Sequence, residues 1–429
     1  MISEIEYKSP QEIKLFQEEK LQELLQYLNI KSTFYQRVFQ QQNITISEIK
    51  TLEDLTKLPV TTKEELHTYN DDFICVPKAK IIDYVTTSGT TGSPVFFGLS
   101  DKDLERLAYN EAISFACSGV SKDDTIQLMT TIDRRFLAGL AYFLGARKLG
   151  AGIIRVGAGI PELQWDSIHK FNPTYLIAVP SFLLKLIAYA QNNGIDVNAS
   201  SIKGVICIGE PLKNQDFSDN SLSQKIKEKW NIELYSTYAS TEMSTAFAEC
   251  EFQQGGHLHP ELIIVEILDE DNQPVKDGEE GELVVTTLDV ETIPLLRFKT
   301  GDVVKAHSDA CKCGRNTLRL GPVIGRKKEM IKYKGTTIYP PAMINVLNDF
   351  SEIENYIIEL DKNEIGMDNI TIKLGTKAAS EDLMKRLKDH IRAKLRVLPT
   401  LIIMSMDDVH KLNFPGINRK PILFVDKRN

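Results

Sequence analysis

The sequence contains no apolar run long enough to cross a membrane. A spanning helix needs roughly 18 or more apolar residues, and no apolar run in the sequence, such as Leu176–Val179, approaches that length. The first residues, Met1–Glu6, have neither a basic start nor an apolar core, so no signal peptide is expected. An excess of positive charge is also missing, because the formal net charge is -8 at pH 7. Nucleic acid and membranes are therefore not expected as partners.

Cysteine is scarce, and three of the six cysteines stand alone in the sequence, namely Cys75, Cys117 and Cys207. This usage does not suggest a disulfide framework, so the reducing cytoplasm is the expected location. Internal repeats and low-complexity segments are lacking as well. A hydrophobic content of 42% is typical of a soluble globular protein, and 429 residues predict two or more domains.

What the sequence does contain, after a helical and charged stretch of about 70 residues, is an alternation of strand and helix patterns. Four apolar segments are predicted to be strands, at residues 125–129, 152–156, 175–179 and 204–208. A helix is predicted over 181–191, with Ser181 as its N-cap and Gly194 beyond its end. Continuous apolar strands separated by helices predict a parallel sheet that is covered on both faces.

The pattern changes twice in the second half of the chain. After about residue 255, short strands at 262–268 and 283–287 alternate with turn residues, which indicates a small antiparallel or barrel-like subdomain. Beyond Gly325-Arg326, a strand at 356–360 and an amphipathic helix starting after Ser380 indicate a small α+β domain. We therefore expect an α/β fold with an N-terminal domain (1–325, including a subdomain at about 245–325) and a C-terminal domain (326–429).

The most unusual stretch is Thr86–Pro94, which follows the apolar segment Ile81–Val85 and consists almost entirely of hydroxyl-bearing residues and glycine. Its centre is Ser88-Gly89-Thr90-Thr91-Gly92. Glycines let the backbone approach a ligand closely, and successive N–H groups and hydroxyls can form an anion site. It is not a Walker A loop, because no Gly-Lys-Ser/Thr ends it. Alone, such a stretch is more typical of a flexible polar loop than of a binding site.

Four further segments share this composition, and most of them follow predicted strands. They are Gly209-Glu210-Pro211, Tyr238-Ala239-Ser240-Thr241-Glu242, Lys299-Thr300-Gly301-Asp302 and Gly325-Arg326. Parallel sheets place their ligands at the carboxyl ends of strands. An isolated acidic residue in a turn is usually solvated surface, but a set of five such segments in one chain favours a binding site.

In order and spacing these segments resemble the adenylate-forming superfamily, most closely its phenylacetate–CoA ligase branch, over nearly the whole chain. Such enzymes make an acyl-adenylate from a carboxylic acid and ATP, and then pass the acyl group to a thiol. The resemblance implies a ligase that uses ATP, Mg²⁺ and CoA on a small, aryl carboxylic acid, with a mobile C-terminal domain. One alternative is an adenylation enzyme that transfers the acyl group to a carrier protein and not to CoA. The other is a nucleotide-binding protein without turnover. Whether the protein forms a homodimer is left open.

The resemblance also implies roles for individual residues. Ser88, Gly89, Thr90, Thr91 and Gly92 would hold the β and γ phosphates, Thr241 the α-phosphate, and Glu242 the Mg²⁺ ion. Tyr238, with Ala239 and Ser240 beside it, and Gly209-Glu210-Pro211 would wall the adenine, Asp302 would accept from the ribose hydroxyls, and Arg326 would reach ribose or phosphate. Lys420 would be the catalytic cation, and Lys328 would be the hinge about which the C-terminal domain turns. That rotation would move Lys420 out of the site and bring in the segment Lys332–Tyr339, whose Gly335 would border the channel for the thiol.

A second constellation consists of Cys250, His257, Cys311 and Cys313. Three cysteines and one histidine match the closed tetrahedral site of structural zinc, and the related branch has the same four positions. Free thiols are the alternative, and His259 is a competing ligand. A zinc ribbon that binds nucleic acid does not suit the acidic net charge.

The chain departs from the family pattern at several positions. Ser93 stands where a phosphate-binding lysine is usual, and Arg419 replaces a glycine beside Lys420. Lys328 replaces the commoner aspartate at the hinge. In the segment expected near the acid, Asp133-Arg134-Arg135 replaces a Gly- and aromatic-rich sequence. Arg134 and Arg135 would either recognise a polar or acidic group on the substrate or lie on the surface.

Overall fold

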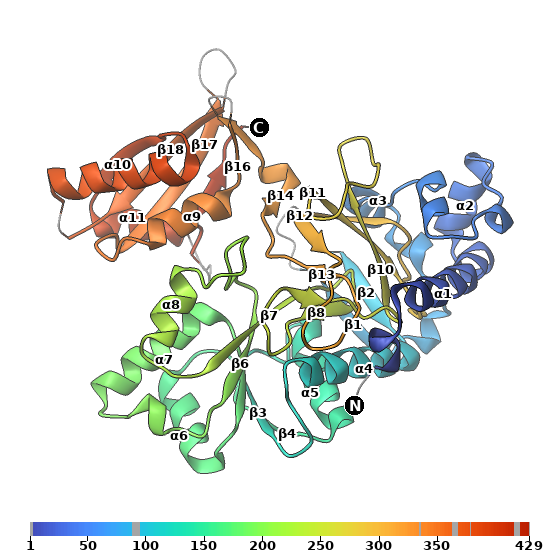
Figure 1. Ribbon diagram of the computed structural model, residues 1–429, viewed down its shortest axis with the longest axis horizontal. Coiled ribbons are helices and arrows are strands. Elements are labelled where there is room, and N and C mark those ends of the chain that lie inside the picture. Colours follow the sequence, from blue (N-terminus) through green and yellow to red (C-terminus); the bar gives the residue numbers. More distant parts are fainter. Residues whose placement is uncertain are drawn as a thin grey trace. The chain divides into compact units, whose positions relative to one another are not determined.

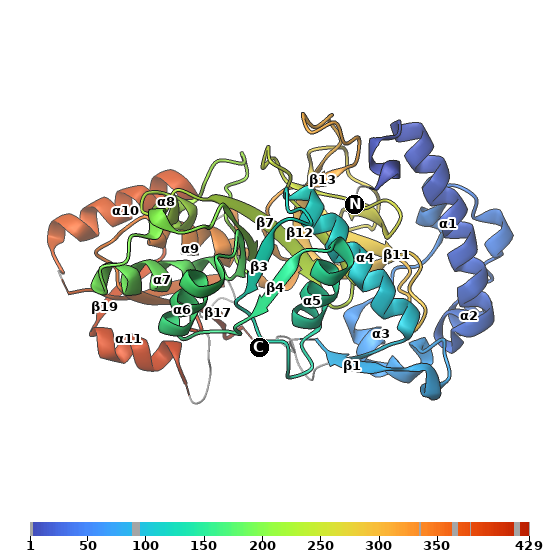
Figure 2. The ribbon, with the colours of Figure 1, turned by 90° about the horizontal axis from the view of Figure 1, so that it is seen from below.

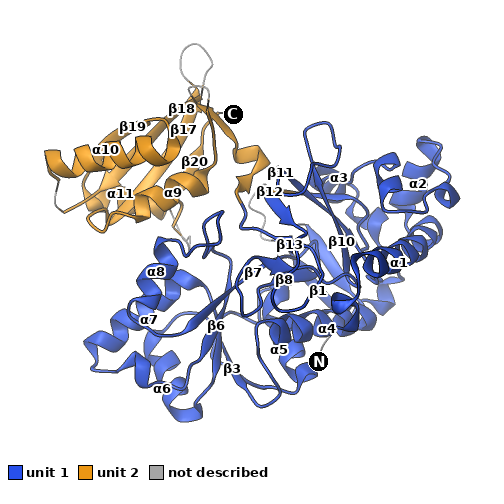
Figure 3. Ribbon diagram, in the orientation of Figure 1, with its two compact units in different colours: residues 1–300, 304–323 blue, residues 301–303, 324–429 orange. Residues whose placement is uncertain are grey.

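The structure, a computed structural model, describes residues 3–87, 95–333, 336–362, 368–377, 379–415 and 421–428 (Figure 1). The chain divides into two compact units, residues 1–300 with 304–323 and residues 301–303 with 324–429 (Figure 3). Each unit is described by itself. The domain limits expected from the sequence, 1–325 and 326–429, stay predictions.

The first unit is built on a sheet whose first half is parallel. Its strands lie in the order β4 (Gly152–Arg155), β3 (Thr125–Leu128), β5 (Tyr175–Ala178), β6 (Gly204–Ile208) and β7 (Glu233–Ser240), and all neighbours are parallel. The four strands predicted from apolar runs are confirmed. Side chains alternate between two separate cores, because Leu176 and Val205 pack in one and Ile177 and Ile206 in the other.

Helices cover both faces of this half, as the continuous apolar strands predicted (Figures 1 and 2). Helices α6 (Pro161–Phe171), α7 (Pro180–Asn192) and α8 (Ser221–Lys227) contribute Trp165, Leu183 and Ile226 to one core. Helices α4 (Asp101–Cys117) and α5 (Leu137–Leu149) contribute Phe115 and Tyr142 to the other. A doubly covered α/β sheet results.

The start of α7 differs from the prediction. The N-cap is Val179, not Ser181, because Pro180 takes the first helical position. Proline has no N–H to leave unsatisfied there and its fixed φ suits the helix, so it sets the boundary. Gly194 lies just beyond the end of the helix with φ 68°, as expected.

The sheet continues beyond β7 with antiparallel pairs. The further strands are β8 (Thr245–Ala248), β9 (Gly256–His257), β13 (Arg319–Leu320), β12 (Phe298–His307), β11 (Glu280–Thr287) and β10 (Ile263–Leu268). The pairs β7–β8, β8–β9, β9–β13, β13–β12 and β10–β11 are all antiparallel. A separate hairpin pairs β1 (Asp83–Thr86) with β2 (Phe96–Leu99).

Helices α1 (Pro10–Lys31), α2 (Thr33–Gln41) and α3 (Lys63–Thr68) precede the sheet. Helices α1 and α3 begin with capping boxes at Ser9 and Thr62. In each, the hydroxyl of the cap residue accepts from the backbone N–H of the glutamate three residues later, and that glutamate's carboxylate accepts from the backbone N–H of the cap residue. Leu21 and Leu28 are fully buried in the largest core, whereas Leu15, which shares their helical spacing, is 55% exposed.

The second unit is a small α+β domain, as predicted. Its sheet has the order β19 (Thr400–Met404), β18 (Asp368–Gly375), β17 (Asn355–Lys362) and β20 (Phe424–Asp426). The other elements are α9 (Pro340–Asn348), α10 (Glu381–Leu395), α11 (Met406–Asn413), β14 (Gly325–Arg326), β15 (Ile331–Tyr333) and β16 (Thr336–Ile338). Ser380 caps α10, and the four apolar residues expected on one face, Leu383, Leu387, Ile391 and Leu395, are buried.

Within the described parts of the chain, no helix combines the length and the apolar character that crossing a membrane requires.

Candidate active site and metal centre

Two of the predicted segments lie at one edge of the parallel sheet. Strands β6 and β7 are parallel neighbours, with Ile208 paired to Thr237. Gly209-Glu210-Pro211 directly follows β6, and Tyr238-Ala239-Ser240 forms the end of β7, so the fold brings both segments to the same sheet edge. Gly209 has φ 76°, a conformation that favours glycine.

Glu210 has a local structural partner that the sequence did not suggest. Its two carboxylate oxygens accept from the backbone N–H and the hydroxyl of Ser181, each at 2.8 Å. Ser181 lies in the first turn of α7, where N–H groups have no partner within the helix. The positive end of the helix dipole also stabilises a carboxylate at this position. Glu210 therefore joins the end of β6 to the start of α7.

Thr241 and Glu242 lie in the turn between β7 and β8, and both are partly buried. The next residue, Met243, is fully buried and anchors the turn in the core. Tyr238 packs its ring against Phe247 of β8, with the ring centroids 6.0 Å apart. The turn thus carries the Glu242 carboxylate and the Thr241 hydroxyl close in sequence to the Tyr238 ring, and buried Met243 anchors it.

Asp302 and Arg326 lie together in the second unit. They are paired residues of β12 and β14, and the Nε atom of Arg326 is 3.5 Å from Oδ1 of Asp302. A Cβ at Gly325 would lie 2.4 Å from the Tyr339 ring, so only glycine fits before Arg326. The proposed hinge, Lys328, lies in a short 3₁₀ turn, Lys327–Glu329, and its carbonyl accepts from Arg428 at 3.3 Å.

Several predicted residues lie outside the described residues. These are Ser88, Gly89, Thr90, Thr91 and Gly92, together with Ser93, Gly335, Arg419 and Lys420. The described residues on either side of the first segment are bonded to each other: Thr87 N–H donates to the Val95 carbonyl at 2.9 Å, and Val95 N–H donates to the Thr87 hydroxyl at 3.1 Å. The roles of the residues outside stay predictions.

Arg134 and Arg135 are exposed and adopt an unusual backbone conformation. Their φ angles are 63° and 58°, in the left-handed region that favours glycine. The Arg135 carbonyl accepts from the Thr86 N–H at 3.1 Å, which ties this segment to the end of β1. The family's glycine-rich sequence suits such a conformation better, so the arginines are accommodated here against a conformational cost.

The four metal-ligand candidates converge. The ligand atoms of Cys250, His257, Cys311 and Cys313 all lie within 4.8 Å of one another. The Sγ atoms of Cys250 and Cys311 are 3.7 Å apart, and Cys313 Sγ is 3.5 Å from His257 Nε2. In a tetrahedron with Zn–S bonds of about 2.3 Å, the sulfurs lie about 3.8 Å apart. The donor set and its spacing therefore fit a zinc ion.

The neighbours of the two histidines decide which of them belongs to this cluster. His257 Nδ1 is 3.0 Å from the Thr317 hydroxyl, which leaves Nε2 directed at the cluster. Burial, with Arg315 nearby, lowers the pKa of His257 to about 3, so the ring is neutral, the form that binds metals. His259 has both nitrogens occupied, by Glu6 and by Ser114. It is not available as the competing ligand.

A charged network behind the candidate metal centre was not predicted. Glu6 lies in the 3₁₀ turn Glu4–Tyr7, and its carboxylate contacts Arg315 Nε and His259 Nδ1, each at 2.6 Å. All three side chains are buried. Burial would raise the pKa of the Cys313 thiol, but hydrogen bonds from the backbone and side chain of Arg315 lower it below its ordinary value. No local pattern joins residues 309 positions apart, so sequence reasoning had no signal for this pair.

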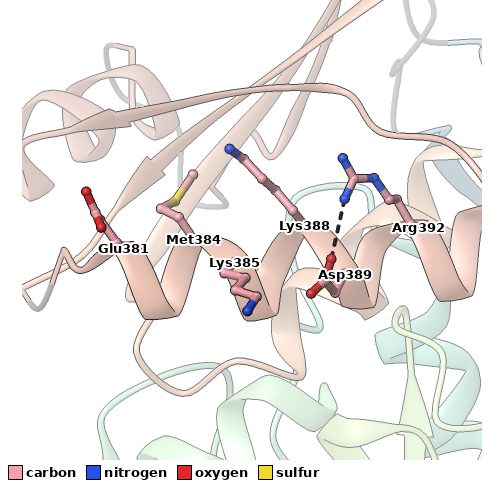
Figure 4. A pocket seen from close by; sticks show the side chains of 6 residues that line it. All are labelled: Glu381, Met384, Lys385, Lys388, Asp389 and Arg392. Atoms are coloured by element: carbon pink, nitrogen blue, oxygen red, sulfur yellow. Dashed lines mark hydrogen bonds and ion pairs between the residues drawn. The ribbon is translucent and has the colours of Figure 1, made fainter.

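The exposed face of α10 carries a hollow that does not coincide with any predicted site. It is lined by Glu381, Met384, Lys385, Lys388, Asp389 and Arg392 (Figure 4). All six side chains come from one helix, and Arg392 and Asp389 pair with each other at 3.4 Å. Groups from a single helix face do not converge on a ligand, so this hollow is a surface feature.

Comparisons with known proteins identify the family and the fold of this chain. The model of the AMP-binding enzyme family matches residues 15–290. The phenylacetate-coenzyme A ligase of Thermus thermophilus is 28% identical to this chain, over 86% of this chain and 83% of the relative. The phenylacetate-coenzyme A ligase of Escherichia coli K12 is 27% identical, over 99% of this chain and 97% of the relative. A 2-hydroxyisobutyryl-CoA ligase structure, in complex with 2-HIB-AMP, aligns with a TM-score of 0.85 at 23% identity, covering 99% of this chain and 91% of that one.

The structural match confirms the predicted fold class, and the full-length relatives confirm the resemblance to the phenylacetate–CoA ligase branch. Since the family model covers well over half of the sequence, this chain belongs to the AMP-binding enzyme family.

Proposed function

We propose that this protein activates a carboxylic acid with ATP, forming an acyl-adenylate and pyrophosphate, and then transfers the acyl group to the thiol of CoA. The observation that carries the proposal is the placement of two family segments, 209–211 and 238–242, at one edge of the parallel sheet. A small aryl acid is the proposed substrate, because four relatives that match over 83% or more of their own length are phenylacetate-coenzyme A ligases.

The described residues take the following proposed roles. Tyr238 and the backbone of 209–211 bind the adenine, while the Glu210 carboxylate keeps that backbone fixed to α7. Thr241 donates to the α-phosphate, where charge develops as pyrophosphate leaves. Glu242 supplies an oxygen ligand for Mg²⁺, which prefers hard oxygen donors. Asp302 accepts from the ribose hydroxyls, and Arg326, paired to it on β14, adds a positive charge.

The test is acid-dependent pyrophosphate release, measured with a panel of aryl and small aliphatic acids. We expect release with at least one aryl acid and loss of release in Glu242→Gln. ATP binding without any acid-stimulated release would leave only a nucleotide-binding protein. Adding CoA or a carrier protein to the acyl-adenylate then decides the acceptor, and sedimentation of the same sample tests for a homodimer.

We further propose that Cys250, His257, Cys311 and Cys313 hold a structural zinc ion, as the spacing of their ligand atoms supports. An ion there would join the β8–β9 region to the segment before β13, which otherwise has little regular structure. Elemental analysis of protein purified without chelators is expected to give one zinc per chain. A metal-free protein with unchanged thermal stability would refute this. None of the six cysteines, all of which lie in the described parts of the chain, forms a disulfide, which supports the proposed cytoplasmic location.

A further inference from the structure

The turn between β7 and β8 holds an unfavourable backbone conformation. Ser244, its last residue, has φ 47°, in the left-handed region that residues other than glycine rarely adopt. Such conformations persist only where the surrounding structure holds them, and they often occur at functional sites. The same turn carries Thr241 and Glu242, so what holds it also sets the position of these two residues.

Ser244 is tied to Thr241 by two hydrogen bonds. The Ser244 N–H donates to the Thr241 carbonyl at 3.3 Å, and the Ser244 hydroxyl donates to the same oxygen at 3.2 Å. At the other side of the turn, the Met243 N–H donates to the Ser240 hydroxyl at 3.3 Å. A shift of Ser244 would therefore move the Thr241 carbonyl, and with it the backbone that carries Glu242.

A buried arginine of α4 holds Ser244 in place. The Nη1 atom of Arg106 donates to the Ser244 carbonyl at 2.5 Å, and its Nη2 atom donates to the Thr245 hydroxyl at 3.0 Å. The same guanidinium also donates to the Leu262 carbonyl at 2.6 Å and to the Leu288 carbonyl at 2.7 Å. It thus joins the turn to the two segments that flank β10 and β11.

The acceptors of Arg106 are all uncharged oxygens, although the residue is only 7% exposed. Burying a cation is costly, and an apolar side chain would fill the same space at a lower cost. What an apolar side chain cannot do is bind several carbonyls at once in a fixed geometry, which the guanidinium does. One helical turn later, Asn110 accepts from the Ala246 N–H at 3.0 Å and extends this support along β8.

We propose that Arg106 is a positioning residue for adenylate formation, which holds the turn in the conformation that presents Thr241 and Glu242 to the magnesium-bound nucleotide. This rests on the proposed function, because it takes the Mg²⁺ role of Glu242 from there. Arg106 itself does not touch the substrate. Its effect reaches the site through the Ser244 carbonyl and the two bonds from Ser244 to Thr241.

The test measures the rate of acid-dependent pyrophosphate release against Mg²⁺ concentration, in the full-length protein. Arg106→Lys keeps the charge but cannot bind four acceptors in one plane. We expect the Mg²⁺ concentration for half-maximal rate to rise about tenfold, which corresponds to the loss of a charge-assisted hydrogen bond. Ser244→Ala, which removes only the hydroxyl bond to Thr241, should give a shift of about threefold in the same direction.

Arg319→Lys is the matched control, since Arg319 is also buried and donates to two backbone carbonyls, those of Gln254 and Asp309. It should lower thermal stability without changing the Mg²⁺ dependence. If Arg106→Lys and Ser244→Ala lower stability only, as the control does, Arg106 supports the core and the inference is wrong. If Arg106→Lys fails to fold, Ser244→Ala decides alone. An unchanged Mg²⁺ dependence in Glu242→Gln would instead overturn the role of Glu242 in the proposed function.

Discussion

Replacing Glu6 with glutamine tests the buried network behind the proposed metal centre. The change keeps the size of the side chain but removes the negative charge between Arg315 and His259, to which Glu6 lies 2.6 Å away in each case. Glu6 is 1% exposed and Arg315 is 6% exposed, so neither water nor salt can replace the lost partner. Breaking one side of a buried ion pair costs about 3–5 kcal/mol.

Because glutamine still accepts one hydrogen bond, we expect a loss near the lower limit, about 3 kcal/mol. In a unit of this size that corresponds to a decrease in Tm of about 4 to 5 °C. The assay is thermal unfolding followed by circular dichroism. Glu4→Gln, an exposed glutamate in the same 3₁₀ turn, is the control and should leave Tm unchanged.

The variant has a second consequence at the proposed metal centre. Arg315 hydrogen-bonds the Cys313 thiol through its backbone and side chain, so an unpaired Arg315 should disturb that ligand. We expect faster zinc release to a chelator in Glu6→Gln than in Glu4→Gln. A Tm within about 1 °C of the unchanged protein, with equal zinc release, would show that the Glu6–Arg315 pair contributes no stability and would refute the reasoning.

Three further predictions concern other parts of the chain. Burial raises the pKa of Glu111 to about 8. In the unfolded state the same carboxyl loses its proton above a pKa of about 4.3. The folded state therefore holds one proton more than the unfolded state between about pH 4.3 and about pH 8, and the free energy of unfolding decreases as pH rises through that range. Glu111→Gln should raise Tm more at pH 9 than at pH 5, and an equal effect at both would contradict the raised pKa. Arg135→Gly removes the conformational cost at φ 58° and should stabilise the fold by about 1 kcal/mol; if the arginine recognises an acidic group, the KM of a dicarboxylic substrate rises while that of a monocarboxylic one does not. Asp302→Asn should raise the KM for ATP about tenfold, as expected for a lost ribose hydrogen bond. With 2′,3′-dideoxy-ATP, which lacks the ribose hydroxyls, the KM should be equally high for both proteins. An unchanged KM for ATP would exclude Asp302 from the ribose site.

The parallel sheet could be predicted from the sequence because its strands are buried on both faces and read as continuous apolar runs. Strand β6 was predicted with its observed limits, 204–208, and β3, β4 and β5 differ from the predictions by one residue at the end. The start of α7 was predicted wrongly, since Ser181 has the chemistry of an N-cap but bonds to Glu210 instead. That partner lies 29 residues away, beyond the reach of a local pattern.

The metal-ligand candidates show the same limit in a different form. Residue types and spacing suggested the three cysteines, but the choice between His257 and His259 depends on Thr317, Glu6 and Ser114, which come from three distant parts of the chain. Likewise the sequence pointed to Thr241 and Glu242, whereas the arginine that holds their turn, Arg106, carries no motif. Residues that contact a ligand tend to be recognisable in a sequence; residues that hold them in place are found through the fold.

The pairing of Glu6 with Arg315 also has a consequence for the order of events during synthesis. Translation proceeds at about 5–20 residues per second, so the 309 residues between the two partners take about 15 to 60 s to make. During that time Glu6 has been made, but the arginine that binds it has not. Glu6 can therefore reach its buried position only after Arg315 has been made, and Cys311 and Cys313, which precede Arg315 by four and two residues, are made just before it.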